Sequence, residues 1–162
     1  MLKNEILMTT NFNFSQSSFT EVNFEVRDTD YFGLEINSDN LIFEINFTPY
    51  YKDINSTEIF LHTRYYIEHE KDKKISIFHA DYVSSFELSG DMLQKQKNKT
   101  LIPLNTFYKL LGITISMSRG YFLARTIGHQ INDFPFPILD PLKFTLESPY
   151  IYNDEFLKLE ME

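Results

Sequence analysis

The hydrophobic period of this chain changes once along its length, and this change limits the possible folds more than any other feature. In residues 41–47, LIFEINF, polar side chains alternate with apolar ones that share a face: Leu41, Phe43, Ile45 and Phe47. A period of two is typical of a β-strand. The same alternation recurs in three further segments, residues 19–26, 59–67 and 75–88. We therefore expect four strands in the first half of the chain.

Polar, turn-forming stretches separate these segments at residues 37–40, 49–57 and 68–74. Strands joined by short connections are usually antiparallel neighbours, because a parallel pair needs a long crossover. We therefore expect an antiparallel sheet of the meander type, with each strand beside the next one in the sequence.

The second half of the chain has helical spacing. After a polar segment at residues 91–100, apolar residues recur every three or four positions, starting at Phe107. Asn105 precedes them and belongs to the residue types that commonly cap a helix N-terminus. This pattern predicts a long helix over residues 105–127.

Prolines then interrupt regular structure, with three of them between residues 134 and 141. We expect residues 132–141 to cross a surface in extended form. Asp140 followed by Pro141 is a helix-start signal and predicts a short helix over residues 141–147. The last segment, residues 153–162, is expected either to add a helix or to fray. The predicted fold class is α+β, with both helices packed on one face of a four-stranded sheet in a single domain, residues 1–162.

Composition excludes several classes of function. The 162 residues suffice for one core, and the absence of cysteine excludes disulfides and thiolate metal sites. A net charge of -8 disfavours nucleic acid and anionic membranes as partners. No apolar run approaches the roughly 20 residues that span a bilayer, and the apolar run at the N-terminus is too short for a signal peptide. We expect a soluble, cytoplasmic protein without membrane insertion.

The residues that carry chemistry form no recognisable catalytic motif. There is no nucleophile elbow, phosphate loop or zinc-protease helix motif. His62 and His69 have acidic neighbours, but nothing in the sequence makes them converge, so no metal and no cofactor are expected. His79 and Asp81 share a strand face and could form a pair, which is more simply a surface pair than an acid–base site. The chain is therefore not expected to be an enzyme.

Small residues recur every four positions in the predicted long helix, at Gly112, Ser116, Gly120, Ala124 and Gly128. Glycine in a helix costs roughly 1 kcal/mol against alanine, so this spacing needs a compensating contact. A ridge of small side chains lets a second backbone approach closely. The neighbour is either the chain's own sheet, which the residues alone favour, or the same helix of a second copy across a two-fold axis.

Two sequence stretches resemble a known family. ITISMSRG at residues 113–120, followed later by PILDPLKF at residues 137–144, is similar to the C-terminal half of the SecB family of bacterial protein-export chaperones. The resemblance implies a SecB-like fold that assembles as a dimer of dimers through its long helices. The interface would then include Gly112, Ser116, Arg119 and Gly120.

The resemblance also implies a function. SecB-like chaperones hold unfolded polypeptides in hydrophobic grooves without ATP, for protein export or for a dedicated client such as a toxin–antitoxin pair. The positions that match the grooves are Phe43, Ile45, Phe47, Tyr108, Leu142 and Phe144. SecB also docks on the SecA translocase through acidic residues, which correspond to Glu21 and Glu25, both expected on the polar face of the first strand, and less directly to Asp81.

Two other functions stay open from the sequence. An antiparallel sheet gripping one long helix could instead enclose a small hydrophobic ligand as a monomeric carrier, with the abundant Phe and Tyr side chains lining the cavity. An enzyme that uses His79 and Asp81 is the other alternative. The oligomeric state separates the carrier from the chaperone.

Overall fold

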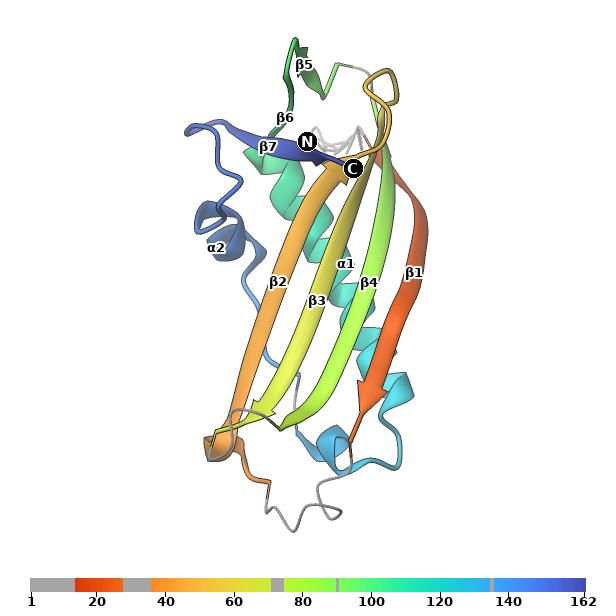
Figure 1. Ribbon diagram of the computed structural model, residues 1–162, viewed down its shortest axis with the longest axis vertical. Coiled ribbons are helices and arrows are strands. Elements are labelled where there is room, and N and C mark those ends of the chain that lie inside the picture. Colours follow the sequence, from red (N-terminus) through yellow and green to blue (C-terminus); the bar gives the residue numbers. More distant parts are fainter. Residues whose placement is uncertain (1–13, 28–35, 71–74, 90, 135) are drawn as a thin grey trace, which may run out of the picture.

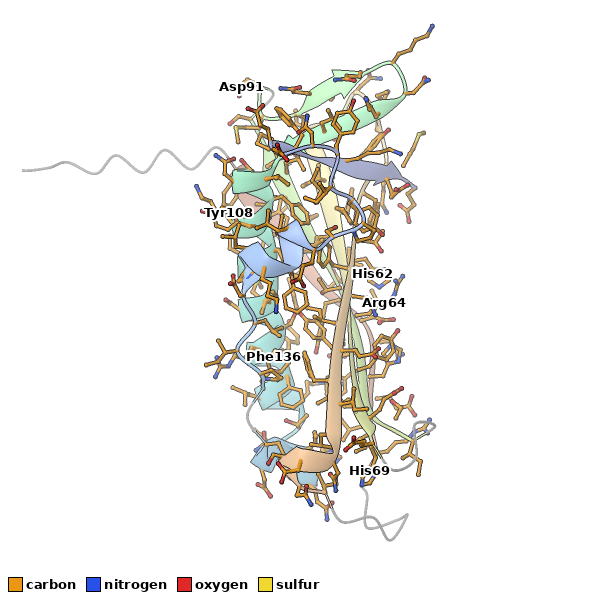
Figure 2. All side chains as sticks on the ribbon, turned by 90° about the vertical axis from the view of Figure 1, so that its left-hand side faces the viewer. His62, Arg64, His69, Asp91, Tyr108 and Phe136 are labelled. Carbon is orange, nitrogen blue, oxygen red and sulfur yellow. The ribbon has the colours of Figure 1, made fainter. Side chains whose placement is uncertain are left out.

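The computed structural model describes residues 14–27, 36–70, 75–89, 91–134 and 136–162. Four long strands form most of one sheet: β1 (Phe14–Val26), β2 (Leu41–Tyr51), β3 (Glu58–His69) and β4 (Ser76–Leu88). They cover the four segments in which the sequence predicted strands. Both helices lie on the same side of this sheet (Figure 2), as expected; α1 crosses its face, whereas α2 lies beside the edge of β2 (Figure 1).

The order of the strands differs from the predicted meander. β2, β3 and β4 follow one another in space, but β1 pairs with β4, so that the order is β1-β4-β3-β2. The prediction of a meander assumed short connections throughout, and it was wrong because residues 27–40, between β1 and β2, are not a short connection. The antiparallel pairing of the four long strands was correct.

Three further strands extend the sheet to seven in the order β1-β4-β3-β2-β7-β6-β5. The polar segment at residues 91–100 forms most of a hairpin of β5 (Gln94–Gln96) and β6 (Lys99–Pro103). The C-terminal segment forms β7 (Phe156–Met161), not the predicted helix or frayed end. β7 is antiparallel to β6 but parallel to β2, so the sheet is mixed.

β7 forms because its side chains alternate. Leu157 and Leu159 are buried, whereas Lys158 and Glu160 are exposed. This is the same period of two that identifies the long strands, in a segment too short for the pattern to stand out from helical spacing. The sequence signal was present and the prediction misread it.

The long helix α1 (Leu104–Arg125) agrees with the predicted one except at its ends. Pro103, not Asn105, occupies the N-cap position, and Leu104 N donates instead to Glu155 O at 2.9 Å. At the other end the Thr126 hydroxyl donates to Phe122 O at 2.7 Å. A 3₁₀ helix (Gln130–Asp133) follows.

The short helix α2 (Pro141–Leu146) begins as the sequence predicted. An oxygen of Asp140, Oδ1, accepts hydrogen bonds from the backbone N–H of Leu142 at 3.0 Å and of Lys143 at 3.4 Å. This side chain satisfies two N–H groups that have no partner inside the helix. Residues 136–140, which lead into α2, carry no helix or strand, as the prolines predicted.

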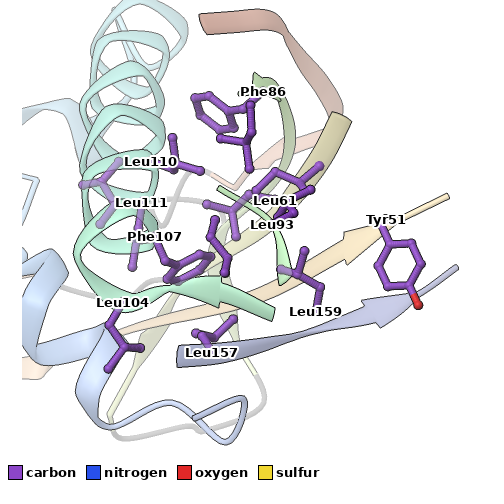
Figure 3. Packing of buried hydrophobic residues seen from close by; sticks show 14 residues of the cluster. Tyr51, Leu61, Phe86, Leu93, Leu104, Phe107, Leu110, Leu111, Leu157 and Leu159 are labelled. Carbon is purple, nitrogen blue, oxygen red and sulfur yellow. The ribbon is translucent and has the colours of Figure 1, made fainter. Parts of the chain in front are cut away.

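The core lies between the sheet and α1 and consists of two clusters. The first joins the N-terminal half of α1 to β7 and to the upper part of the sheet, as Figure 3 shows for Phe107, Leu110 and Leu157. The second is aromatic and lies under the C-terminal half of α1, where Phe122 contacts Phe78 and Phe136 with ring centroids 4.9 and 5.2 Å apart. α1 is therefore fixed to the sheet along its whole length.

Candidate binding grooves around the short helix

The six residues predicted to bind clients do not form one surface. The structure distributes them over three hollows around α2 and the extended segment before it. Ile45, Phe47 and Phe144 line the first, Phe43 lines the second, and Tyr108 and Leu142 line the third. We call these hollows the β2 groove, the aromatic pocket and the acidic groove.

The β2 groove has a volume of about 450 Å³ and runs between strand β2 and the end of α2. Phe47 forms its apolar wall, with its ring 5.7 Å from that of Phe107 and 6.3 Å from that of Tyr150. Arg64 and Glu147 add one charge of each sign to the lining. The groove therefore combines an aromatic wall with polar groups.

One edge of β2 lies beside this groove. On that side β2 pairs only with β7, through Tyr50 and Tyr51, so residues 41–49 have no strand partner there among the described residues. An unpaired strand edge presents backbone N–H and C=O groups that can bind an extended peptide. A segment in the β2 groove can therefore make main-chain as well as side-chain contacts.

The aromatic pocket is smaller, about 160 Å³, and lies near the C-terminal end of α1. Phe43 contacts Phe136 here with ring centroids 5.3 Å apart. Tyr65 contacts both rings, and its burial raises the pKa of its hydroxyl to about 12. The pocket therefore offers a largely apolar surface of roughly one large side chain in size, with Ser38 as the polar residue of its lining.

Phe43 and Phe47 are half-buried rather than freely exposed. Each contributes one edge to a hollow and the remainder to the core, because the segment at residues 136–150 packs over β2. The sequence could not reveal this, since a strand with one apolar face looks the same whether that face is covered or open. Phe136 and Tyr150, which it did not identify as site residues, supply the covering rings.

The acidic groove, about 460 Å³, lies on the other side of α2 and reaches the start of α1. Its apolar lining includes Tyr108, Leu142, Leu146 and Phe156. Asp154 and Glu155 stand at its rim, and both are exposed. In Figure 2, Tyr108 of this groove lies on the side of the molecule formed by the helices. Phe136 of the aromatic pocket lies between α1 and the sheet in the same view.

The predicted helix interface divides into two parts. A Cβ added to Gly112 would lie 3.4 Å from the Pro141 ring of the same chain, so this glycine admits the start of α2. Nothing lies within 4 Å of the corresponding point at Gly120 among the described residues. Ser116, Arg119 and Gly120 are exposed along the helix.

The three carboxylates predicted to dock on a translocase do not share one face. A β-bulge between Glu21 and Asn23 turns Glu21 toward the helices, where it pairs with Arg125 at 3.2 Å. Glu25 lies on the opposite, outer face. The expectation that both glutamates lie on one polar face of the first strand was therefore wrong.

The outer face also holds the pair of His79 and Asp81 that the enzyme hypothesis requires. His79 Nε2 lies 3.0 Å from Asp81 Oδ1, and the imidazole stacks on Tyr66 with ring centroids 4.6 Å apart. Figure 2 shows His62 and Arg64 on this same side of the sheet, away from the helices. Burial, followed by the charge of Arg64, lowers the pKa of His62, which favours its neutral form.

Among the described residues no histidine lines the β2 groove, the aromatic pocket or the acidic groove. His62 and His79 nevertheless contact Arg64 and Tyr66, two residues that line the β2 groove. Within the described ranges, no three His, Cys, Asp or Glu side chains converge in a way that could hold a metal ion. The described residues thus form a set of hollows suited to binding, and the charged side chains that line them are Arg64, Glu147, Asp154 and Glu155.

The ligand-carrier hypothesis needs a closed cavity between the sheet and α1. That space is occupied by side chains of the two core clusters, among them the fully buried Tyr65, Phe107 and Phe122. The hollows lie instead at the edge of the sheet and around α2.

None of the helices in the described ranges is long and apolar enough to span a membrane.

Comparisons with known proteins find similarity among solved structures but none by sequence. No family model matches the sequence, and no curated protein matches it. Among solved structures the chain is similar to the Rv1957 SecB-like chaperone of Mycobacterium tuberculosis, solved in complex with a ChAD peptide from the Rv1956 HigA1 antitoxin. The TM-score is 0.49 at 6% sequence identity, and the match covers 79% of this chain and 87% of that chain.

Proposed function

We propose that this protein is an ATP-independent holdase chaperone that binds unfolded polypeptides in the grooves around α2. The observation that carries the proposal is the combination of three hollows, each with an aromatic wall, with a free strand edge. An unfolded client presents scattered apolar side chains together with unpaired backbone. The aromatic hollows take the side chains, and the edge of β2 pairs with the backbone.

The net charge of -8 supports this role. A protein that exposes apolar grooves needs net charge to stay soluble, and a negative surface disfavours clients rich in acidic residues. Outside the hollows, Leu123 on α1, at 44% exposed, and Ile127 in the turn just after it, at 73%, leave further apolar surface.

That surface supports self-association as the second part of the proposal. The helix face formed by Ser116, Arg119 and Gly120 would meet the same face of a second copy, giving a dimer of dimers. Identical patches must meet in such an interface, and an open glycine lets the two backbones approach closely. Gly112 would lie at its margin, because Pro141 already packs beside it.

The clients would be preproteins before export or one dedicated protein such as the antitoxin of a toxin–antitoxin pair, bound in the cytoplasm. If SecA is a partner, it would meet Glu25 and Asp81 on the outer face of the sheet. Glu25 is exposed but pairs with Arg27 at 2.6 Å, so docking would have to compete with that ion pair.

Replacing Phe43 and Phe47 together with serine tests the holding function. The two substitutions remove aromatic surface from the aromatic pocket and the β2 groove, and we expect several times more chaperone to be needed to suppress aggregation of a denatured model protein. Light scattering during dilution of the client from urea measures this. Because both rings are half-buried, the assay is run where urea denaturation shows the variant folded.

A matched control replaces Phe60 and Val83, which are also half-buried but lie on the outer face of the sheet. This double serine variant should suppress aggregation as well as the unchanged protein does. Equal suppression by the Phe43/Phe47 variant would move the client site away from the grooves.

Replacing Gly120 with leucine tests the assembly. The larger side chain should prevent close approach of two helices and split a tetramer into dimers, measured by size-exclusion chromatography with light scattering. Gly120→Ala is the control: it removes a helix glycine at a gain of up to about 1 kcal/mol and adds only a small Cβ. A tetramer that survives Gly120→Leu contradicts the proposed interface, and a monomeric unchanged protein contradicts the assembly itself.

A further inference from the structure

The acidic groove differs from the other two hollows in its charge. Asp154 and Glu155 line its rim, and its remaining lining contains no lysine, arginine or histidine. Neither carboxylate has an ion-pair partner within the described residues. Two unneutralised negative charges therefore stand beside an apolar surface.

The apolar part of the groove comes from both helices. Leu142 and Leu146 are four residues apart and therefore lie on the same face of α2, with 46% and 58% of their surfaces exposed. Tyr108 and Leu104 of α1 form the facing wall. Apolar side chains exposed to this degree are stabilised when a partner covers them.

The rim is held in place by the backbone. Asn153 Oδ1 accepts hydrogen bonds from the N–H groups of Glu155 at 2.9 Å and Phe156 at 2.8 Å, which closes the turn before β7. Glu155 O in turn accepts from Leu104 N at the start of α1. The two carboxylates are thus carried by a turn that is hydrogen-bonded to itself and to the helix.

We infer that the acidic groove is a separate binding site for a polypeptide segment in which leucine-like side chains flank a lysine or arginine. The apolar side chains cover Leu142 and Leu146, and the cation reaches Asp154 and Glu155. This inference deepens the proposed function, from which it takes the class of partner. It adds a site that selects by charge, whereas the lining of the β2 groove balances Arg64 against Glu147.

The test uses two short fluorescein-labelled peptides. In one, leucines flank a lysine–arginine pair; in the other, two glutamates replace that pair. Fluorescence anisotropy at low salt should show the unchanged protein binding the basic peptide about tenfold more tightly than the acidic one, and raising the salt to about 0.3 M should remove most of this preference.

In the double variant Asp154→Asn, Glu155→Gln, the preference for the basic over the acidic peptide should fall about fivefold or more. Both carboxylates are replaced together because each exposed charge contact contributes only modestly to binding. The control variant Asp91→Asn, Glu160→Gln removes the same charge at two exposed positions that line none of the three hollows. It should keep the preference. A preference that survives the first variant, or that the control loses equally, overturns the inference.

Two further variants separate this inference from the proposed function. Leu142→Ser, Leu146→Ser should weaken binding of both peptides, because it removes the shared apolar surface. Phe43→Ser, Phe47→Ser should weaken suppression of aggregation while keeping the charge preference. If aggregation suppression is absent altogether but the preference depends on Asp154 and Glu155, the acidic groove stands and the holdase proposal fails.

Discussion

The β2 groove and the acidic groove lie on opposite sides of the same short helix, yet they differ in what they offer a partner. Phe144 and Glu147 point to the β2 groove, and Leu142 and Leu146 to the acidic groove. Beside its apolar side chains, the β2 groove has a free strand edge and one charge of each sign, whereas the acidic groove has two carboxylates. One helix of six residues thus separates a site suited to extended backbone from a site that selects by charge.

The two grooves also depend on different parts of the fold. One wall of the β2 groove belongs to strand β2, in the first third of the chain, whereas the acidic groove is completed by the turn before β7 at the end of the chain. Damage to one should therefore be separable from damage to the other. Substitutions in β7 and at the start of α2 test this difference.

The largest effect is expected for Leu157→Ala. Leu157 is fully buried, so the substitution should lower the free energy of unfolding by about 2–5 kcal/mol, as measured by urea denaturation. In the folded variant, loosening of β7 should weaken binding of the basic peptide more than suppression of aggregation. Equal losses in both assays would show that the two grooves form one cooperative unit.

A smaller effect that both grooves share is expected for Asp140→Ala. It removes the oxygen that caps α2 and should cost about 1 kcal/mol of helix stability, seen as faster hydrogen exchange at residues 142–146. Both binding assays should weaken together, because α2 forms a wall of each groove. Asp140→Asn keeps a capping oxygen and should behave like the unchanged protein; a loss in that variant would point to the charge rather than the cap.

Local patterns identified most elements of this fold. Alternation located the four long strands, helical spacing located α1, and Asp140 followed by Pro141 located α2. β7 escaped because an alternation of six residues is too short to distinguish from a helix end. The sequence also predicted six client-binding residues as one group, and the structure divides them among three hollows.

Two features of the site could not be derived from local pattern. The β-bulge at Glu21 shifts the alternation of β1 by one residue, which turns Glu21 inward and leaves Val22 58% exposed. The covering of Phe43 and Phe47 depends on Phe136 and Tyr150, which lie far away in the sequence. Neither feature has a signal within the strand that it affects.

The sequence by itself determined the four long strands, the two helices and most of their apolar faces, because these depend on neighbours within a few residues. The tertiary structure alone decided which strand lies beside which, how β7 joins the sheet, and how α2 divides the surface into two grooves. These depend on contacts between distant segments, whose pairing is decided by the packing of the whole chain.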